Sequence, residues 1–194
     1  MVRFAGGPGI RRSRRQAPDV FDFGLAGYVP TWTNDLDALV TTHSGRLGDL
    51  VGRRLVRASL MWDAKRDVWW ADGPVVLDFD GVRLEINHQK FDDLSITWDT
   101  IDLDRPIRWA GSRRPKLRWR HDVPQDLAEL HGRPVTGVQL LRWASDDPTD
   151  LGNGSPQVGF GFGGREMTVF NALDENGLWF GPLGRHHQVV WSAG

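Results

Sequence analysis

The chain has 194 residues, of which 40% are hydrophobic and 25% are charged, proportions close to those of globular proteins. Its formal net charge of −1 excludes a strongly basic domain of the kind that nucleic acids or anionic membranes attract as a whole. The absence of cysteine excludes disulfide bonds, thiolate catalysis and every zinc site that needs a cysteine ligand.

The N-terminal residues 1–18 combine a glycine-proline run with several arginines and almost no apolar residues, which predicts a mobile tail. The arginine pairs lead into Gln16 and Pro18 instead of an apolar segment, and no run approaches the roughly 18 apolar residues that span a bilayer. Together with the lack of cysteine, this pattern predicts a cytoplasmic location.

The first helix is expected from Asn34, which is the expected N-cap, because Leu36, Leu39 and Val40 follow at helical spacing. Beyond it, two stretches share one pattern at a constant spacing of 80 residues. Both 47–55 and 127–135 read leucine, any residue, an acid, leucine, any residue, glycine and arginine, and end on an apolar residue. Gly52 and Gly132 stand where a helix C-terminus favours glycine. The pattern therefore predicts a short helix, a glycine stop and a strand, twice.

Two β-hairpins are predicted further along the chain, at a spacing of 83 residues. Alternating apolar residues lead into Asp80-Gly81 in the first and Gly163-Gly164 in the second, and both dipeptides favour two-residue turns. These turns pair Phe79 with Val82, Leu77 with Leu84, Val75 with Ile86 and Val76 with Glu85 in the first hairpin, and Phe160 with Met167, Val158 with Val169 and Gly161 with Glu166 in the second. On the polar face of the first hairpin, Asp78 opposes Arg83, which predicts a cross-strand ion pair.

One more strand follows an acidic turn in each half, so the expected fold is α+β and mostly β. It consists of two diverged repeats, each a short helix followed by about four antiparallel strands, packed together through their apolar hairpin faces. The expected organisation is a mobile tail at 1–18, an N-terminal repeat with a leading segment at 19–104, a basic connector at 105–121 and a C-terminal repeat at 122–194.

The connector is the first candidate for a functional site. It has no acidic residue between Arg105 and Arg120, and it interleaves cations with tryptophan, a combination that can contact phosphates and stack on bases. The residues assigned to this alternative nucleic-acid site are Arg113, Arg114, Lys116, Arg118, Trp119 and Arg120. The competing interpretation is a solvated connector whose tryptophans cover the edge of the core.

The second candidate is Trp69 and Trp70, with Arg66 close by in the sequence. In an extended segment, successive side chains point to opposite faces, so one indole faces outward unless another part of the chain covers it. An exposed tryptophan beside an arginine is typical of a protein-binding hot spot. The competing interpretation is that the other repeat covers both indoles, because two small lobes need large apolar lids.

A third candidate is the acidic turn after each hairpin, at Asp92 and Asp93 with His88 nearby and at Asp174 and Glu175, since carboxylates on a loop can hold a divalent cation. Acidic residues are also common in turns for structural reasons. No short catalytic motif occurs in the chain, so we expect no catalytic residue, no cofactor and no metal. The leading hypothesis is a non-catalytic cytoplasmic protein-binding module, such as an adaptor or an immunity-like protein. Nucleic-acid binding through the connector is the alternative, and a metal-dependent enzyme is the second.

Overall fold

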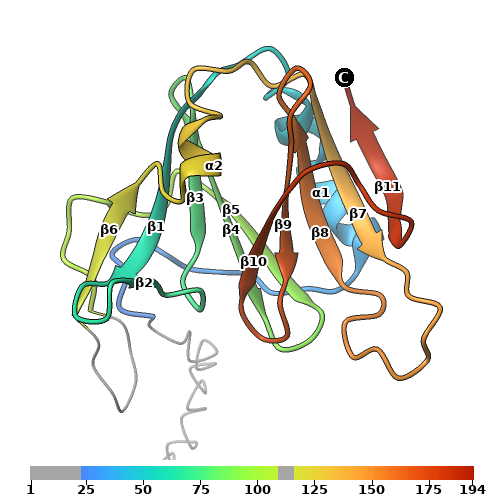
Figure 1. The fold of residues 1–194 in the computed structure, drawn as a ribbon, viewed down its shortest axis with the longest axis horizontal. Coiled ribbons are helices and arrows are strands. Elements are labelled where there is room, and N and C mark those ends of the chain that lie inside the picture. The colour runs from blue at the N-terminus through green and yellow to red at the C-terminus, as the bar shows by residue number, and fades with distance from the viewer. Residues whose placement is uncertain (1–22, 109–115) are drawn as a thin grey trace, which may run out of the picture.

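A computed structural model describes residues 23–108 and 116–194 and shows a mostly β fold, with about 10% helix and 42% strand (Figure 1). Two antiparallel sheets, one of six strands and one of five, face each other. This confirms the prediction of a mostly β fold with short helices. The expected tail at 1–18 lies outside the described residues.

Helix α1 spans Leu36–Gly48 and packs between the two sheets through the buried Leu39 and Leu47. Its N-cap is Asp35, one residue after the expected position. An Asp35 carboxylate oxygen accepts hydrogen bonds from the second and third amides of the first turn, at 3.0 and 3.1 Å. The cap satisfies two amides that have no partner inside the helix.

The first sheet contains the strands β1 (Leu55–Asp63), β2 (Val68–Trp69), β3 (Val75–Phe79), β4 (Val82–Gln89), β5 (Asp93–Trp98) and β6 (Leu117–His121). Its order is β2-β1-β3-β4-β5, and β6 also pairs with β1. The β3–β4 hairpin has the predicted register throughout. The predicted ion pair across it is wrong: Asp78 opposes Arg83 but forms its ion pair with Arg57 of β1, at 3.5 Å.

The second sheet contains β7 (Gly137–Trp143), β8 (Pro156–Gly161), β9 (Glu166–Asn171), β10 (Asn176–Phe180) and β11 (His187–Ala193), preceded by the short helix α2 (Gln125–Ala128). Its order is β10-β9-β8-β7-β11, and the β8–β9 hairpin has the predicted register. The strand order β7-β8-β9-β10 repeats the order β1-β3-β4-β5 of the first sheet. In each sheet a later strand, β6 or β11, returns to pair with the first, so the sheets have six and five strands where about four per repeat were expected.

Four backbone hydrogen bonds join the segments that lead into the two sheets. The amide of Gly52 donates to the carbonyl of Val135 at 2.8 Å, and the amide of Gly132 donates to the carbonyl of Leu55 at 2.7 Å. The amides of Leu55 and Val135 donate to the carbonyls of Arg133 and Arg53, at 3.1 and 2.8 Å. A shift of 80 residues converts each bond of a pair into the other, which is the geometry of a local pseudo-twofold axis. Gly52 and Gly132 have φ angles of 88° and 74°, which glycine adopts without strain.

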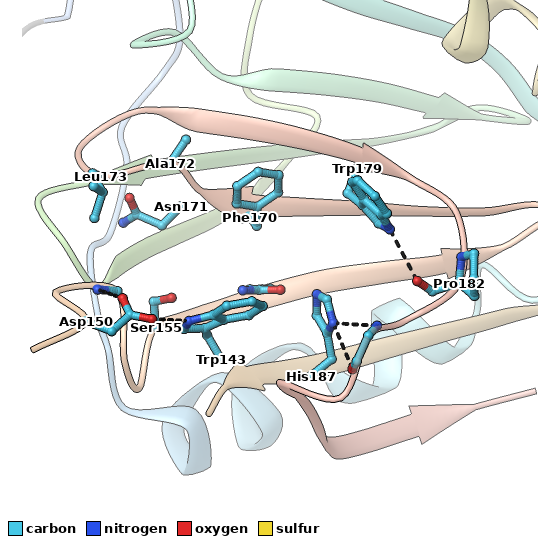
Figure 2. Close-up of a pocket in the computed structure, with 13 residues that line it drawn as sticks. Trp143, Asp150, Ser155, Phe170, Asn171, Ala172, Leu173, Trp179, Pro182 and His187 are labelled. Carbon is cyan, nitrogen blue, oxygen red and sulfur yellow. Dashed lines mark hydrogen bonds between the residues drawn. The ribbon is translucent and has the colours of Figure 1, made fainter. Parts of the chain in front are cut away.

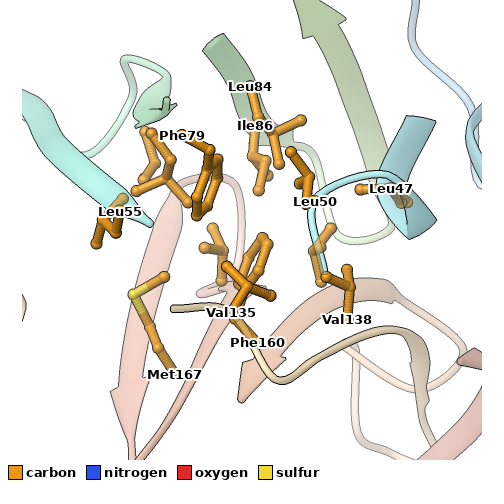
Figure 3. Packing of buried hydrophobic residues seen from close by; sticks show 14 of the residues in the cluster. Leu47, Leu50, Leu55, Phe79, Leu84, Ile86, Val135, Val138, Phe160 and Met167 are labelled. Carbon is orange, nitrogen blue, oxygen red and sulfur yellow. The ribbon is translucent and has the colours of Figure 1, made fainter. Parts of the chain in front are cut away.

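The main core lies between the inner faces of the sheets (Figure 3). Phe79 of the first sheet stacks on Phe160 of the second, with ring centroids 5.9 Å apart. Leu50, which follows α1, and Val135, which precedes β7, are buried in the same cluster. The hairpin faces predicted to be apolar are the faces that meet. In the two described ranges, no helix has the length and apolar character needed to cross a membrane.

A buried polar group also connects the sheets. The His88 imidazole on β4 lies 3.0 Å from the side-chain oxygen of Asn176 on β10 and 3.1 Å from the carbonyl of Pro156 on β8. The Asn176 amide group donates to the side-chain oxygen of Asn87 at 2.7 Å. Burial lowers the pKa of His88 to about 4, against the opposing effect of its hydrogen bonds. The imidazole is therefore neutral at neutral pH and acts as a fixed link between the sheets.

Candidate functional site

The outer face of the first sheet, which points away from the main core, is covered by the chain itself. Met61 of β1 and Val76 of β3 point to this face and are buried beneath Leu25, Tyr28 and Ile101. Two backbone hydrogen bonds tie the covering segments together, from Asp102 to Ala26 at 2.9 Å and from Arg108 to Gly24 at 2.8 Å. This second hydrophobic cluster leaves the outer face of the first sheet closed.

The outer face of the second sheet is hollowed instead. A pocket of about 530 Å³ lies on this face, a volume typical of sites that bind small molecules (Figure 2). The residues that line it are Trp143, Asp150, Gly152, Ser155, Gln157, Phe170, Asn171, Ala172, Leu173, Trp179, Pro182, Gly184 and His187. The second hydrophobic cluster, which closes the first sheet, has no member from β7 to β11. We call this site the aromatic pocket.

Two pairs of rings form the sides of the aromatic pocket. Phe170 of β9 and Trp179 of β10 lie along one side, and Trp143 of β7 and His187 of β11 along the other (Figure 2). Strand β8 runs between β9 and β7 and places Gln157 on the floor of the pocket. Strand alternation places Gln157, Phe170 and Trp179 on this face, because their sequence neighbours Val158, Val169, Leu178 and Phe180 pack in the main core.

Trp143 is held by the loop that follows its strand. Its indole Nε1 donates to Oδ2 of Asp150 at 2.8 Å, and the amide of Gly152 donates to Oδ1 of the same carboxylate at 2.9 Å. The bond from Trp143 and then that from Gly152 keep the pKa of Asp150 below its usual value. The His187 ring packs edge-on against Trp143, with centroids 5.3 Å apart and an interplanar angle of 82°. The ring of Trp143 therefore has a fixed orientation.

The opposite side depends on a glycine. The ring of Phe170 lies directly over Gly177 of β10, where a Cβ atom would come within 2.3 Å of the ring carbon Cζ. Trp179 stands beside it with 51% of its surface exposed, and its Nε1 donates to the carbonyl of Pro182 at 3.2 Å. Leu173, 53% exposed, also lines the pocket, so apolar surface continues outward from it.

Gln157 is the unusual polar residue of the aromatic pocket. Its side chain is 2% exposed, and within the described part of the chain its Oε1 atom has no hydrogen-bond partner. Leaving a buried acceptor unpaired costs about 1–3 kcal/mol. Thr168 of the neighbouring strand, on the same face of the sheet, also has an unpaired buried hydroxyl. Both atoms are closed to a water-sized molecule, so they are buried polar groups beneath the pocket and not contacts offered to a ligand.

The aromatic pocket has few charges. Among the described residues, its ionisable lining groups are Asp150 and His187, and no lysine or arginine lines it. Both oxygens of Asp150 are already occupied by donors of the chain. Nδ1 of His187 lies 2.9 Å from the amide nitrogen and 3.2 Å from the carbonyl oxygen of Gly184. The described lining therefore offers no lysine or arginine to neutralise a phosphate.

The structure places the predicted protein-binding residues away from this pocket. Trp69 packs against the main core and Trp70 against the second hydrophobic cluster, so successive indoles point to opposite sides as expected. Both are partly buried, and neither indole nitrogen is exposed. Arg66 is exposed, with Nη1 3.8 Å from a carboxylate oxygen of Asp63. Their role in partner binding stays a prediction.

The residues of the alternative nucleic-acid site are divided. Arg113 and Arg114 lie outside the described residues. Lys116 and Arg118 are exposed, whereas Trp119 packs into the second hydrophobic cluster. Arg120 forms an ion pair with Asp67 at 2.9 Å, and its guanidinium lies 4.4 Å from the centroid of the Trp62 ring. Residues 117–121 form β6, so the end of the predicted connector is part of the first sheet.

The residues considered for a metal site have other partners. His88 is buried in the polar link between the sheets, Asp93 forms an ion pair with Lys90 at 2.6 Å, and Asp92 accepts a hydrogen bond from Asn34 at 2.6 Å. Across residues 23–108 and 116–194, no group of three or more histidine, cysteine and acidic side chains could hold a metal ion. The described residues therefore suggest no metal centre.

No protein-family model, curated protein or solved structure matches this chain. What the protein does must therefore be inferred from the chemistry of its own residues.

The alternation of residues along the strands of the second half is a sequence signal for the aromatic pocket. The predicted register of the second hairpin places Val169 in the core, so Phe170 has to point outward. Trp179 likewise lies between two residues that pack against the core, Leu178 and Phe180. Large aromatic residues at outward positions of neighbouring strands indicate either a covering segment or a binding surface.

Proposed function

We propose that the protein is a non-catalytic binding module and that the aromatic pocket is the site where it recognises a partner protein. The observation that carries the proposal is the contrast between the two outer faces. The chain covers the first with its own second hydrophobic cluster and leaves Trp143, Phe170 and Trp179 lining an open pocket on the second.

The composition of the pocket favours binding. Tryptophan is enriched where one protein anchors another, and hot spots of this kind lie in well-packed pockets that exclude water. Trp143 is fixed by its hydrogen bond to Asp150 and by its contact with His187, so it loses little conformational entropy when a partner binds. The Asp150 carboxylate is engaged by two donors of the chain, and Nδ1 of His187 lies within hydrogen-bond distance of Gly184.

The surroundings of the pocket favour a protein partner over a nucleic acid. Leu173 and Trp179 are half exposed and extend the apolar surface beyond the pocket. A nucleic-acid site needs cations for the phosphates, and the pocket has none. Of the residues assigned to the alternative nucleic-acid site, Lys116 and Arg118 are exposed, but the nearby Trp119 is packed against the first sheet. An adaptor or an immunity-like protein is the kind of module that this surface suits.

Affinity capture with the full chain as bait tests the proposal. We expect a partner that binds the unchanged protein and is lost when Trp179 and Leu173 are both replaced by alanine. These two side chains are exposed, so their loss changes stability little. The matched control is Val68→Ala, since Val68 is 48% exposed but lies on the first sheet.

Each result of the capture experiment has a defined meaning. Retention of the partner by Trp179→Ala/Leu173→Ala contradicts the assignment to the aromatic pocket. Loss of the partner with Val68→Ala would instead point to the region of Trp69. If the unchanged protein retains no partner, the proposed function is wrong.

A further inference from the structure

We propose that the aromatic pocket binds a fully methylated ammonium group, which the partner protein presents as a trimethylated lysine side chain. The proposal deepens the proposed function and rests on it for the source of the group. Three features of the described lining support it: aromatic rings on both sides, a carboxylate without a lysine or arginine, and hydrogen-bond acceptors that are already engaged.

Aromatic rings line both sides of the pocket. Phe170 and Trp179 lie along one side, and Trp143 and His187 lie along the other (Figure 2). The face of an aromatic ring is negative and attracts a cation, tryptophan most strongly, and the attraction grows as water is excluded. A cation between the two sides therefore meets aromatic surface in more than one direction.

The positive edges of the two indoles are turned toward the chain itself. The N–H group of an indole is the positive part of its edge and would repel a cation. Nε1 of Trp143 donates to Oδ2 of Asp150 at 2.8 Å, and Nε1 of Trp179 donates to the carbonyl of Pro182 at 3.2 Å. Both N–H groups therefore already have acceptors in the folded chain.

Asp150 adds a negative charge to this surface. The hydrogen bond from Trp143 and then that from Gly152 keep the pKa of Asp150 below its usual value, so its carboxylate is ionised at neutral pH. No lysine or arginine is found among the described lining residues to balance this charge. The pocket thus attracts a cation and disfavours a carboxylate or phosphate, which would lose hydration without compensation.

The engaged acceptors favour a methylated ammonium over a primary one. The carboxylate oxygens of Asp150, Oδ1 of Asn171 and the carbonyl of Pro182 already accept hydrogen bonds from the chain. A primary ammonium has three N–H donors, and some of them would lose water without finding a new acceptor. A trimethylammonium group has no donor to satisfy, so it keeps the attraction to the rings and to Asp150 without this penalty.

The size of the pocket and the surface beside it favour a side chain of a partner as the source of the group. A volume of about 530 Å³ lies in the range that holds a whole drug-sized molecule, so there is room for a methylated lysine side chain and adjoining backbone. Leu173 and Trp179 are half exposed, and the residues that flank the lysine can cover them.

Nuclear magnetic resonance titrations of the full chain test the proposal with matched probes. The indole N–H signals of Trp143 and Trp179, identified with Trp143→Phe and Trp179→Phe, report binding in the pocket. The probes are choline, its neutral isostere 3,3-dimethylbutan-1-ol and the primary ammonium ethanolamine. We expect choline to bind roughly fivefold or more tightly than either of the other two, as a cation–π contribution of ordinary size implies.

Two variants test the groups to which the preference is assigned. Asp150→Asn keeps the size of the side chain and an acceptor for Trp143 but removes the charge, so the preference for choline over its neutral isostere should decrease. The matched control is Asp146→Asn, an exposed aspartate of the same loop that does not line the pocket, and it should keep the preference. Trp179→Leu keeps an apolar side chain without a ring, and it should weaken choline more than the isostere.

Several outcomes overturn the proposal. Equal affinity for choline and 3,3-dimethylbutan-1-ol in the unchanged protein does so without any variant, because the pocket then selects apolar shape alone. Tighter binding of ethanolamine than of choline does so as well, and so does the absence of any change in the Trp143 and Trp179 signals. An equal effect of Asp146→Asn and Asp150→Asn would assign the preference to overall charge and contradict the site.

A second set of probes identifies the source of the group. Tighter binding of the peptide acetyl-Gly-trimethyllysine-Gly-amide than of choline, with acetyl-Gly-Lys-Gly-amide weaker, supports a partner side chain. Preferential binding of choline without binding of the methylated peptide supports the cation chemistry and contradicts a protein partner. Failure to discriminate choline from its isostere, with a partner still captured through Trp179 and Leu173, overturns the present inference and leaves the proposed function standing.

Discussion

Gln157→Met is expected to make the protein more stable. The Gln157 side chain is 2% exposed and its Oε1 atom is unpaired, a condition that costs about 1–3 kcal/mol relative to a paired acceptor. Methionine has a similar length and fills the same space without a strong acceptor. We therefore expect the free energy of unfolding to rise by about 1 kcal/mol.

Urea unfolding of the purified variants measures this change, and Gln139→Met is the matched control. Gln139 lies on the same face of the second sheet but is only partly buried, so the same substitution should change stability by less than about 0.5 kcal/mol. A loss of 1 kcal/mol or more in Gln157→Met would show that the amide has a partner in the folded protein. The interpretation of Gln157 Oε1 as an unpaired buried acceptor would then be refuted.

Three further changes test the fold around the aromatic pocket. As the pH falls from about 6.5 to about 4, the free energy of unfolding should decrease by up to about 3 kcal/mol, because His88 takes up a proton near pH 6.5 when unfolded but only near pH 4 when folded. Urea titrations at several pH values should show a weaker dependence of the free energy of unfolding on pH for His88→Gln, and an equal dependence would contradict the assignment. Gly177→Ala should displace the ring of Phe170 and weaken binding of any pocket ligand at least tenfold, measured by titration, and unchanged affinity would show that the ring position is unimportant. Phe79→Ala should cost about 3–5 kcal/mol in calorimetry, because it removes the ring stacked on Phe160 at the centre of the core, and a loss below 1 kcal/mol would contradict that packing.

The parts of the fold that could be predicted from sequence are those specified by neighbours in the chain. The turn at Asp80 and Gly81 fixes the register of its hairpin, since a shift by one residue would move Leu77 and Leu84 from the core to the outside. Positive φ at Gly52 and Gly132 was also foreseeable, because glycine adopts that conformation without strain. These features depend on local geometry and alternation alone.

The parts that could not be predicted depend on contacts between distant segments. Asp78 pairs with Arg57 because β1 lies beside β3, and the hairpin alone does not contain that information. Trp69 and Trp70 are covered from two sides, by the main core and by the second hydrophobic cluster. The aromatic pocket was missed because its two sides come from β7 and from β9 and β10, which meet only once the sheet has formed.

The four hydrogen bonds between 52–55 and 132–135 make the two halves of the chain one cooperative unit. Each half supplies hydrogen-bond partners for backbone groups of the other half, so neither half can satisfy by itself the segment that leads into its first strand. Fragments 1–108 and 116–194, produced separately, should therefore be largely unfolded, and mixing them should restore the β-sheet spectrum. A partner that binds the aromatic pocket on the second sheet would consequently also protect backbone amides of the first sheet from hydrogen exchange.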